Sequence, residues 1–139
     1  MEVEIFTLCD AATDSGGKLN LLGSFDTLIG GKEPMTHPAC AVAVKIRFSR
    51  IEEGNHAIKI TFADTDGKPV LPSFEGSMHV KIQEGCPTAT TNFILNMQNL
   101  KIEHFGDHSI DLAIDGRHEA SIPLYVREAQ KREEQAKPK

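Results

Sequence analysis

The feature that most constrains the fold is a period-two alternation of apolar and polar residues, which recurs along the chain. Such alternation places apolar side chains on one face of a β-strand and polar side chains on the other. Seven segments show it: residues 19–25, 42–48, 58–62, 78–82, 93–97, 110–114 and 120–126. An eighth, more continuously apolar run spans residues 3–9. The chain therefore reads as a succession of short strands.

Turn residues separate these segments. Asp66-Gly67 and Asp115-Gly116 predict two-residue hairpin turns, because both residue types tolerate the positive φ that such turns need. Seven or eight strands with turns at this spacing are typical of a sandwich or a barrel. We predict an all-β fold: an antiparallel two-sheet sandwich of about 7–8 strands, immunoglobulin-like in outline, with one solvated face on each sheet.

The chain of 139 residues suits one domain, which we place at residues 1–127. Residues 128–139 are polar all round and predict a short helix or tail, and residues 30–38 predict a loop because they hold two glycines and two prolines. Pro123 falls within the last strand and cannot donate a ladder hydrogen bond. That strand should therefore be a sheet edge, paired on one side with residues 109–115.

Composition excludes several classes of protein. The formal net charge is -5 and no basic stripe is present, which argues against nucleic-acid binding. No apolar stretch is long enough to cross a membrane, and the acidic start MEVEIF does not resemble a secretory signal. Cys9, Cys40 and Cys86 are too widely spaced for a disulfide framework or a zinc motif, so we expect a cytoplasmic protein. Cys40 should be buried, and Cys86 should be the most exposed thiol.

The stretch DAATDSGGKLN, residues 10–20, has some likeness to a phosphate-binding loop. A Walker-type loop would need a glycine at Ala12, a Ser or Thr at Leu19, and a following helix. The match fails on all three points. We interpret the stretch as a turn between two strands, with Asp10, Asp14 and Ser15 on a loop at one end of the sandwich.

Metal binding is the alternative hypothesis. DTDG, residues 64–67, has some likeness to a calcium loop but lacks the first and last ligands, so a turn explains it better. His104 and His108 lie near Glu103, Asp107 and Glu119 in sequence. Loop carboxylates of this kind could converge at one end of the sandwich to bind a metal ion or small molecule. No nucleophile or acid/base set is recognisable, so we expect no catalysis and no cofactor.

One predicted strand has an unusual outer face. Asn92, Ile94, Asn96 and Gln98 point together, and Leu100 continues their phase. Amides mixed with aliphatic side chains are more typical of a contact surface than of a solvated face. Either a partner or another part of the chain should cover it. Edge strands offer a second route, through strand addition or homodimer pairing. We therefore predict a non-catalytic module that binds a protein partner or self-assembles.

Four stretches together suggest a family: EIFTLCDAAT, GGKLNLLGSFD, VKIRFSRIEEGNHAIKITFADTDGKP and SIDLAIDGRHEASIPLYVRE. They resemble short uncharacterised bacterial proteins that are grouped as a domain of unknown function, and the likeness covers roughly residues 2–128. The resemblance implies a stand-alone β-sandwich. It implies no activity, ligand or catalytic residue.

Overall fold

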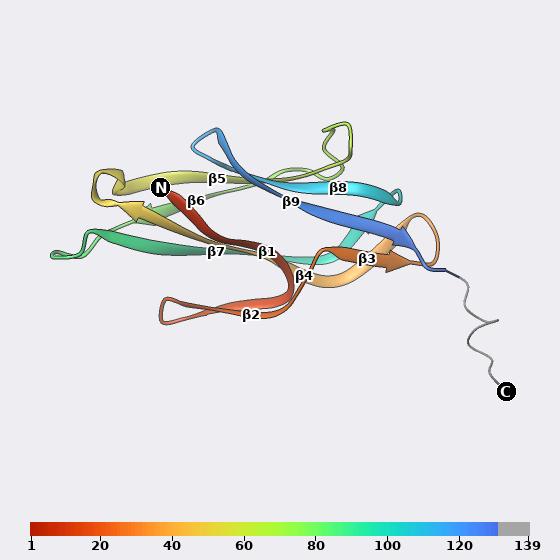
Figure 1. The fold of residues 1–139 in the computed structure, drawn as a ribbon, viewed down its shortest axis with the longest axis horizontal. Coiled ribbons are helices and arrows are strands. Elements are labelled where there is room, and N and C mark those ends of the chain that lie inside the picture. Colours follow the sequence, from red (N-terminus) through yellow and green to blue (C-terminus); the bar gives the residue numbers. More distant parts are fainter. Residues whose placement is uncertain (131–139) are drawn as a thin grey trace.

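The computed structural model describes residues 1–130, which form nine β-strands and one short 3-10 helix (Figure 1). The strands are β1 (Glu2–Ser15), β2 (Lys18–Phe25), β3 (Thr27–Gly30), β4 (Met35–Ser49), β5 (Gly54–Ala63), β6 (Phe74–Val80), β7 (Thr88–Ile102), β8 (Gly106–Ile114) and β9 (Arg117–Glu128). The helix is η1 (Arg50–Glu52). The predicted 128–139 tail lies mostly outside the described residues.

The strands form two packed sheets. One has the order β2-β1-β4-β7 and the other has the order β3-β9-β8-β5-β6. The predicted all-β two-sheet sandwich is confirmed. The immunoglobulin-like outline stays a prediction. One pairing departs from the antiparallel scheme, since β3 runs parallel to β9.

The core lies between the sheets and follows the predicted alternation. Val44 and Ile46 of β4 belong to the same core cluster as Ile110 and Leu112 of β8, and all four side chains are fully buried. Full burial of one such side chain contributes about 1.5–3 kcal/mol. The hairpin turn at Asp115-Gly116 is also confirmed, with positive φ at both residues.

The four-stranded sheet is curled into a half-barrel by a bend in β1 and β2. The first half of β1 pairs with β4, and its second half pairs with β2. At the bend, Gly23 lies opposite Asp10 and has a φ of 68°. This left-handed φ favours glycine, and a Cβ at Gly23 would also push the exposed Asp10 side chain out of its position. Beyond the bend, the β1–β2 hairpin turns back beneath β4 and β7 (Figure 1).

This bend makes two local predictions wrong. Asp10, Asp14 and Ser15 belong to β1 and not to a loop, and the turn is confined to Gly16-Gly17. Leu21 was expected in the core but is 39% exposed. The hairpin packs on the outer side of the four-stranded sheet and has only a small apolar surface to cover there.

Two further predictions need correction. Residues 30–38 are not entirely a loop, because β4 begins at Met35. The last strand is an edge only in part: β3 pairs with β9 from Tyr125 to Glu128, whereas Pro123 lies opposite Ser109 of β8 and beyond the reach of β3. Proline is tolerated there because that side of β9 has no partner among the nine described strands.

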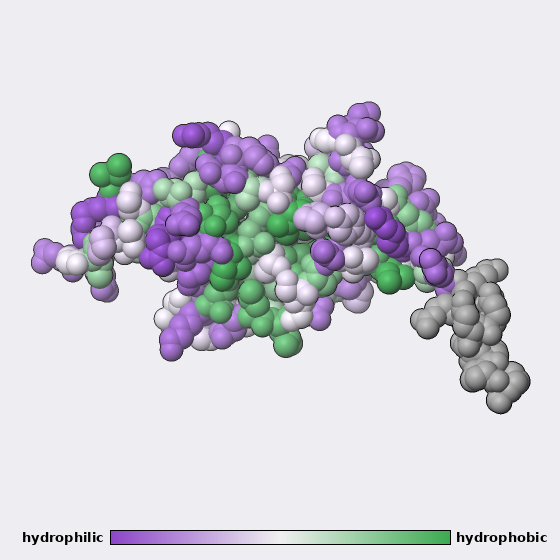
Figure 2. All heavy atoms as spheres, in the orientation of Figure 1, coloured by the Kyte–Doolittle hydropathy of each residue, from purple (hydrophilic) through white to green (hydrophobic). Residues whose placement is uncertain are grey.

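Hydrophobic residues reach the surface between the two sheets, on the face of the molecule that carries β1 and β9 (Figure 2). Leu22 and Ile29 are 69% and 65% exposed. Among residues 1–130, no helix has the length and apolar character needed to cross a bilayer.

Candidate functional site

The predicted contact face lies on the outer side of β7, and the structure divides it in two. Asn92 and Ile94 are half-buried, whereas Asn96 and Gln98 are exposed. Leu100 does not share this face, because Asn99 adopts a φ of 54° and the following residues change sides. Leu100 is buried in the core at 4% exposure. The expected phase was therefore wrong beyond Gln98.

The β1–β2 hairpin covers the first half of this face. Nδ2 of Asn92 donates to Oδ2 of Asp14 at 3.0 Å and to the Gly17 carbonyl at 3.2 Å. The Asn92 amide, together with the Gly17 N–H, lowers the pKa of Asp14 below its usual value. The stretch singled out as a possible phosphate loop therefore closes the curled sheet onto its own last strand.

A small apolar cluster lies under the same hairpin. Its buried members are Cys9, Ala12, Ala41 and Ala43, and Ile94 packs against them. Small side chains let the hairpin approach the sheet closely. Of the two predicted interpretations of the β7 face, coverage by another part of the chain is thus correct at Asn92 and Ile94. Only Asn96 and Gln98 remain available for a partner.

The unpaired side of β7, here called the β7 edge, differs from the other open edges among the described residues. From Thr88 to Leu100 it contains no charged residue. The other open strands have features that oppose strand pairing: β6 has Glu75, β2 begins at Lys18, and the open part of β9 holds Arg117 and Pro123. β3 carries no charge but has only four residues, and very short edge strands also resist pairing. Charges and prolines are the usual protection of an edge. The β7 edge lacks that protection.

Apolar side chains along β7 are incompletely covered. Ala89, Phe93 and Leu95 pack against the core but are only partly buried. The Phe93 ring closes the gap to the opposite sheet, and a Cβ added at Gly76 of β6 would lie 3.2 Å from it. Additional apolar burial at this edge would therefore be favourable.

A groove of about 370 Å³ adjoins the β7 edge. Pro72 and Phe74 border it on one side, and Asn96, Gln98 and Lys101 border it on the other. The exposed half of the predicted face therefore continues into a concave surface with mixed apolar and amide character.

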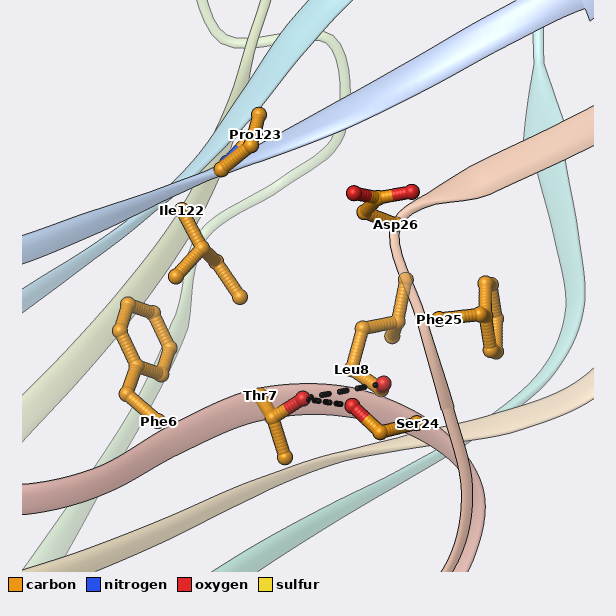
Figure 3. A pocket seen from close by; sticks show the side chains of 8 residues that line it. All are labelled: Phe6, Thr7, Leu8, Ser24, Phe25, Asp26, Ile122 and Pro123. Carbon is orange, nitrogen blue, oxygen red and sulfur yellow. Dashed lines mark hydrogen bonds between the residues drawn. The ribbon is translucent and has the colours of Figure 1, made fainter.

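A second cleft lies at the opposite side of the sandwich, between β1 and β9 (Figure 3). In this view Phe6 and Ile122 lie next to each other on one side of it, and Phe25 and Asp26 lie on the other. The hydroxyls of Thr7 and Ser24 are hydrogen-bonded to each other at its floor. Asp26 at the rim accepts a hydrogen bond from the Thr27 hydroxyl at 2.8 Å. The cleft has a volume of about 350 Å³ and a lining of mixed polar and apolar character. It contains no nucleophile paired with a base.

The acidic residues proposed to bind metal are distributed among separate elements. Asp10 and Asp14 lie in β1, and Asp64 accepts backbone hydrogen bonds within its own turn. Asp107 pairs with Arg127 at 2.7 Å. Within residues 1–130, no three His, Cys, Asp or Glu side chains are grouped closely enough to hold a metal ion.

Sequence reasoning missed an ion pair between His56 of β5 and Asp115, which follows β8. Nδ1 of His56 lies 2.6 Å from Oδ2 of Asp115, and Nε2 lies 2.5 Å from the Glu52 carbonyl. The ring stacks on Phe48 with centroids 4.6 Å apart. Both ring nitrogens therefore face acceptors, which favours the imidazolium form. The Glu52 carbonyl and the Asp115 carboxylate raise the pKa of His56, and His56 lowers the pKa of Asp115.

The cysteines lie as the sequence predicted. Cys40 is buried at 3% exposure, and burial raises the pKa of its thiol to about 11. Cys86 is exposed. All three cysteines are free thiols.

Comparison with known proteins adds a family and a fold. The model of the Family of unknown function (DUF6941) matches residues 4–127. No curated protein matches the chain. Among solved structures, the Pseudomonas fluorescens alkylpurine DNA glycosylase AlkC, bound to DNA containing an abasic site analog, aligns with a TM-score of 0.55 and 7% identity. The alignment covers 91% of this chain and 30% of that chain, so it shows a shared fold in part of the larger protein.

A β-glucosidase from Listeria innocua in complex with isofagomine aligns with a TM-score of 0.48 and 17% identity, over 90% of this chain and 16% of that chain. The present chain thus spans less than a third of the length of either protein.

Proposed function

The chain belongs to the DUF6941 family, whose function is unknown, and we propose that it is a non-catalytic module that assembles through the β7 edge. The observation that carries this proposal is the absence of charge from Thr88 to Leu100 on an open edge. Among the other open strands, β2, β6 and β9 carry charges, β9 also has a proline, and β3 has only four residues. An edge without such protection is suited to strand addition.

Strand addition at β7 would both pair its free backbone groups and cover its apolar side chains. An incoming strand pairs with the free backbone N–H and C=O groups, which otherwise bind water. Its side chains would also cover Phe93 and Leu95, which the sandwich leaves partly exposed. The exposed amides of Asn96 and Gln98 supply polar contacts beside this apolar surface.

We assign the added strand to a second copy of the chain. Two β7 strands that pair about a two-fold axis place uncharged residues opposite uncharged residues in any register within residues 88–100. Like charges directly opposite each other would be destabilising, and none arise here. The edge offers no charge pattern that would select a foreign strand. A symmetric dimer with a continuous eight-stranded sheet follows.

The fold shared with part of a DNA glycosylase does not lead us to propose DNA binding. Phosphate contacts need clustered Lys and Arg, whereas the net charge is -5 and β7 has no basic residue before Lys101.

Light scattering after size-exclusion chromatography tests this function. Because self-association depends on concentration, the wild-type chain should be measured from about 1 to 200 µM. We expect a dimer throughout this range. Asn96→Lys adds a charge to the exposed part of β7 in both copies. This variant should weaken dimerisation by at least about tenfold.

Ser77→Lys is the matched control, because it adds the same charge to the exposed edge of β6. It should leave the dimer unchanged. A wild-type protein that stays monomeric at every concentration would overturn the proposal. Equal weakening by both substitutions would assign the effect to net charge and not to the β7 edge.

A further inference from the structure

A cavity distinct from the β7 edge lies at one end of the sandwich. The 64–70 turn and the segment 103–108 enclose it, and its volume is about 330 Å³. We call it the end cavity. Polar lining comes from Asp64, Glu103 and His108, and apolar lining comes from Val70 and Phe105. A volume at the lower end of the range for ligand pockets restricts it to a small molecule.

His108 gives the end cavity a buried and incompletely bonded polar group. It lies on the inner face of β8, in phase with Ile110 and Leu112, and is 8% exposed. Its Nδ1 lies 3.1 Å from the Gly106 carbonyl, which can only accept, so Nδ1 carries the proton. In the neutral ring Nε2 is then an acceptor, and the described residues offer it no donor. Nε2 is accessible from the end cavity, where a donor from a ligand would replace water.

Asp64 supplies a second acceptor, held in a fixed orientation. Its Oδ1 accepts hydrogen bonds from the N–H groups of Asp66 at 2.9 Å and Lys68 at 3.0 Å. Within residues 1–130, no cation lies within ion-pair distance of Asp64, whereas Glu103 has Lys101 at 3.5 Å. Its Oδ2 is therefore free to accept, and the Asp64 carboxylate retains its negative charge for a ligand.

From this geometry we propose that the end cavity binds a small molecule with a primary ammonium group. Three N–H donors on one positive centre suit a carboxylate oxygen of Asp64 together with Nε2 of His108. The hydrocarbon part of the ligand would contact Val70 and Phe105. A neutral donor would leave the charge of Asp64 unmatched, and a metal ion would find fewer than three grouped ligands among the described residues.

Titration with n-butylammonium, followed by calorimetry and by the ring signals of His108 in NMR spectra, tests the proposal. Saturable binding should occur and should shift the Nε2 signal, whereas butyrate and 1-butanol, of similar size but different charge, should bind at least about tenfold more weakly. Asp64→Asn keeps an Oδ1 acceptor for the turn and removes the charge, so affinity should fall at least about tenfold. His108→Phe should also abolish saturable binding.

Glu75→Gln is the control, because it removes one carboxylate from β6 outside the end cavity. Its affinity for n-butylammonium should match that of the wild type. Absence of saturation up to about 50 mM, a weak-binding limit, would overturn the proposal. So would equal losses in Asp64→Asn and Glu75→Gln, or binding of Zn²⁺ or Ca²⁺ at His108 without binding of the amine.

Discussion

The His56 ion pair should make stability depend on pH. Both ring nitrogens face acceptors, so the folded state favours the imidazolium and the pKa of His56 is raised. A group whose pKa is raised on folding stabilises the protein fully below its unfolded pKa, which is about 6.5 for histidine. This contribution is lost as the pH rises through the higher folded pKa. Stability from His56 should therefore be greater at about pH 6 than at about pH 9.

The magnitude follows from the two hydrogen bonds. A charged donor on the Glu52 carbonyl contributes about 1.5–3 kcal/mol. The bond to Asp115 contributes less, about 0.2–1 kcal/mol, because that carboxylate is 49% exposed and screened by water. We expect His56→Phe to lower the free energy of unfolding by about 2–4 kcal/mol at about pH 6. At about pH 9 one nitrogen lacks its proton, and the loss should shrink to about 0.5–1.5 kcal/mol.

Urea unfolding of the wild type and of His56→Phe at the two pH values measures this effect. The difference between the two proteins isolates the contribution of His56 from those of other titrating groups. Phe keeps a ring against Phe48 while removing both hydrogen bonds. Asp115→Asn is the complementary variant, because Asn tolerates the φ of 52° and can still accept from the Ala57 N–H.

Asp115→Asn should lower the pKa of His56 and flatten the pH profile without disrupting the turn. The Asp115 pKa is itself lowered, so its own contribution is lost only as the pH falls through acidic values, outside this range. An equal loss at both pH values in His56→Phe would refute the argument from protonation.

Three further outcomes are expected. Leu112→Asp should prevent folding, as judged by circular dichroism and solubility, because an unpaired carboxylate in a fully buried position should cost more than about 4 kcal/mol. Gly23→Ala should lower the free energy of unfolding by about 1–2 kcal/mol through its left-handed φ, and urea curves should show part of the loss recovered in an Asp10→Ala background, where the nearest contact is gone. Cys86 should react with a thiol reagent in the folded protein well before Cys40, and equal rates would contradict the assigned burial.

The strands were predictable from sequence because the alternation of β4 and β8 reports directly on which side chains are buried. Val44 and Leu112 face the core as expected. Alternation does not show which other element packs on each face of a strand. Leu19 and Leu21 have the same local pattern as core residues, yet they lie on the outer side of the four-stranded sheet. The bend at Gly23 decides this, and a glycine in a strand pattern is the only signal of it.

The candidate sites were predictable only where strand alternation alone decides the exposure of a side chain. Asn96 and Gln98 are exposed because strand alternation places them there, and no other segment within residues 1–130 covers them. The change of side at Asn99 depends on one left-handed residue, which sequence does not specify uniquely. Contacts such as His56 with Asp115 join residues far apart in the chain, and only the pairing of β5 with β8 brings them together.

The curled hairpin covers part of the outer face of β7 but leaves the β7 edge unpaired. The hairpin contacts β7 from its outer side, through Asp14 and Gly17 on Asn92, and so shields the face near the start of the strand. It does not pair with the backbone of β7, which remains the last strand of its sheet. Weakening the hairpin with Asn92→Ala should therefore expose Ile94 without changing the pairing potential of the edge. Under the dimer proposal, the free energy of unfolding of this variant should fall by about 1 kcal/mol, and its dimerisation constant should stay unchanged. Asn96→Lys should instead keep its stability and dimerise more weakly.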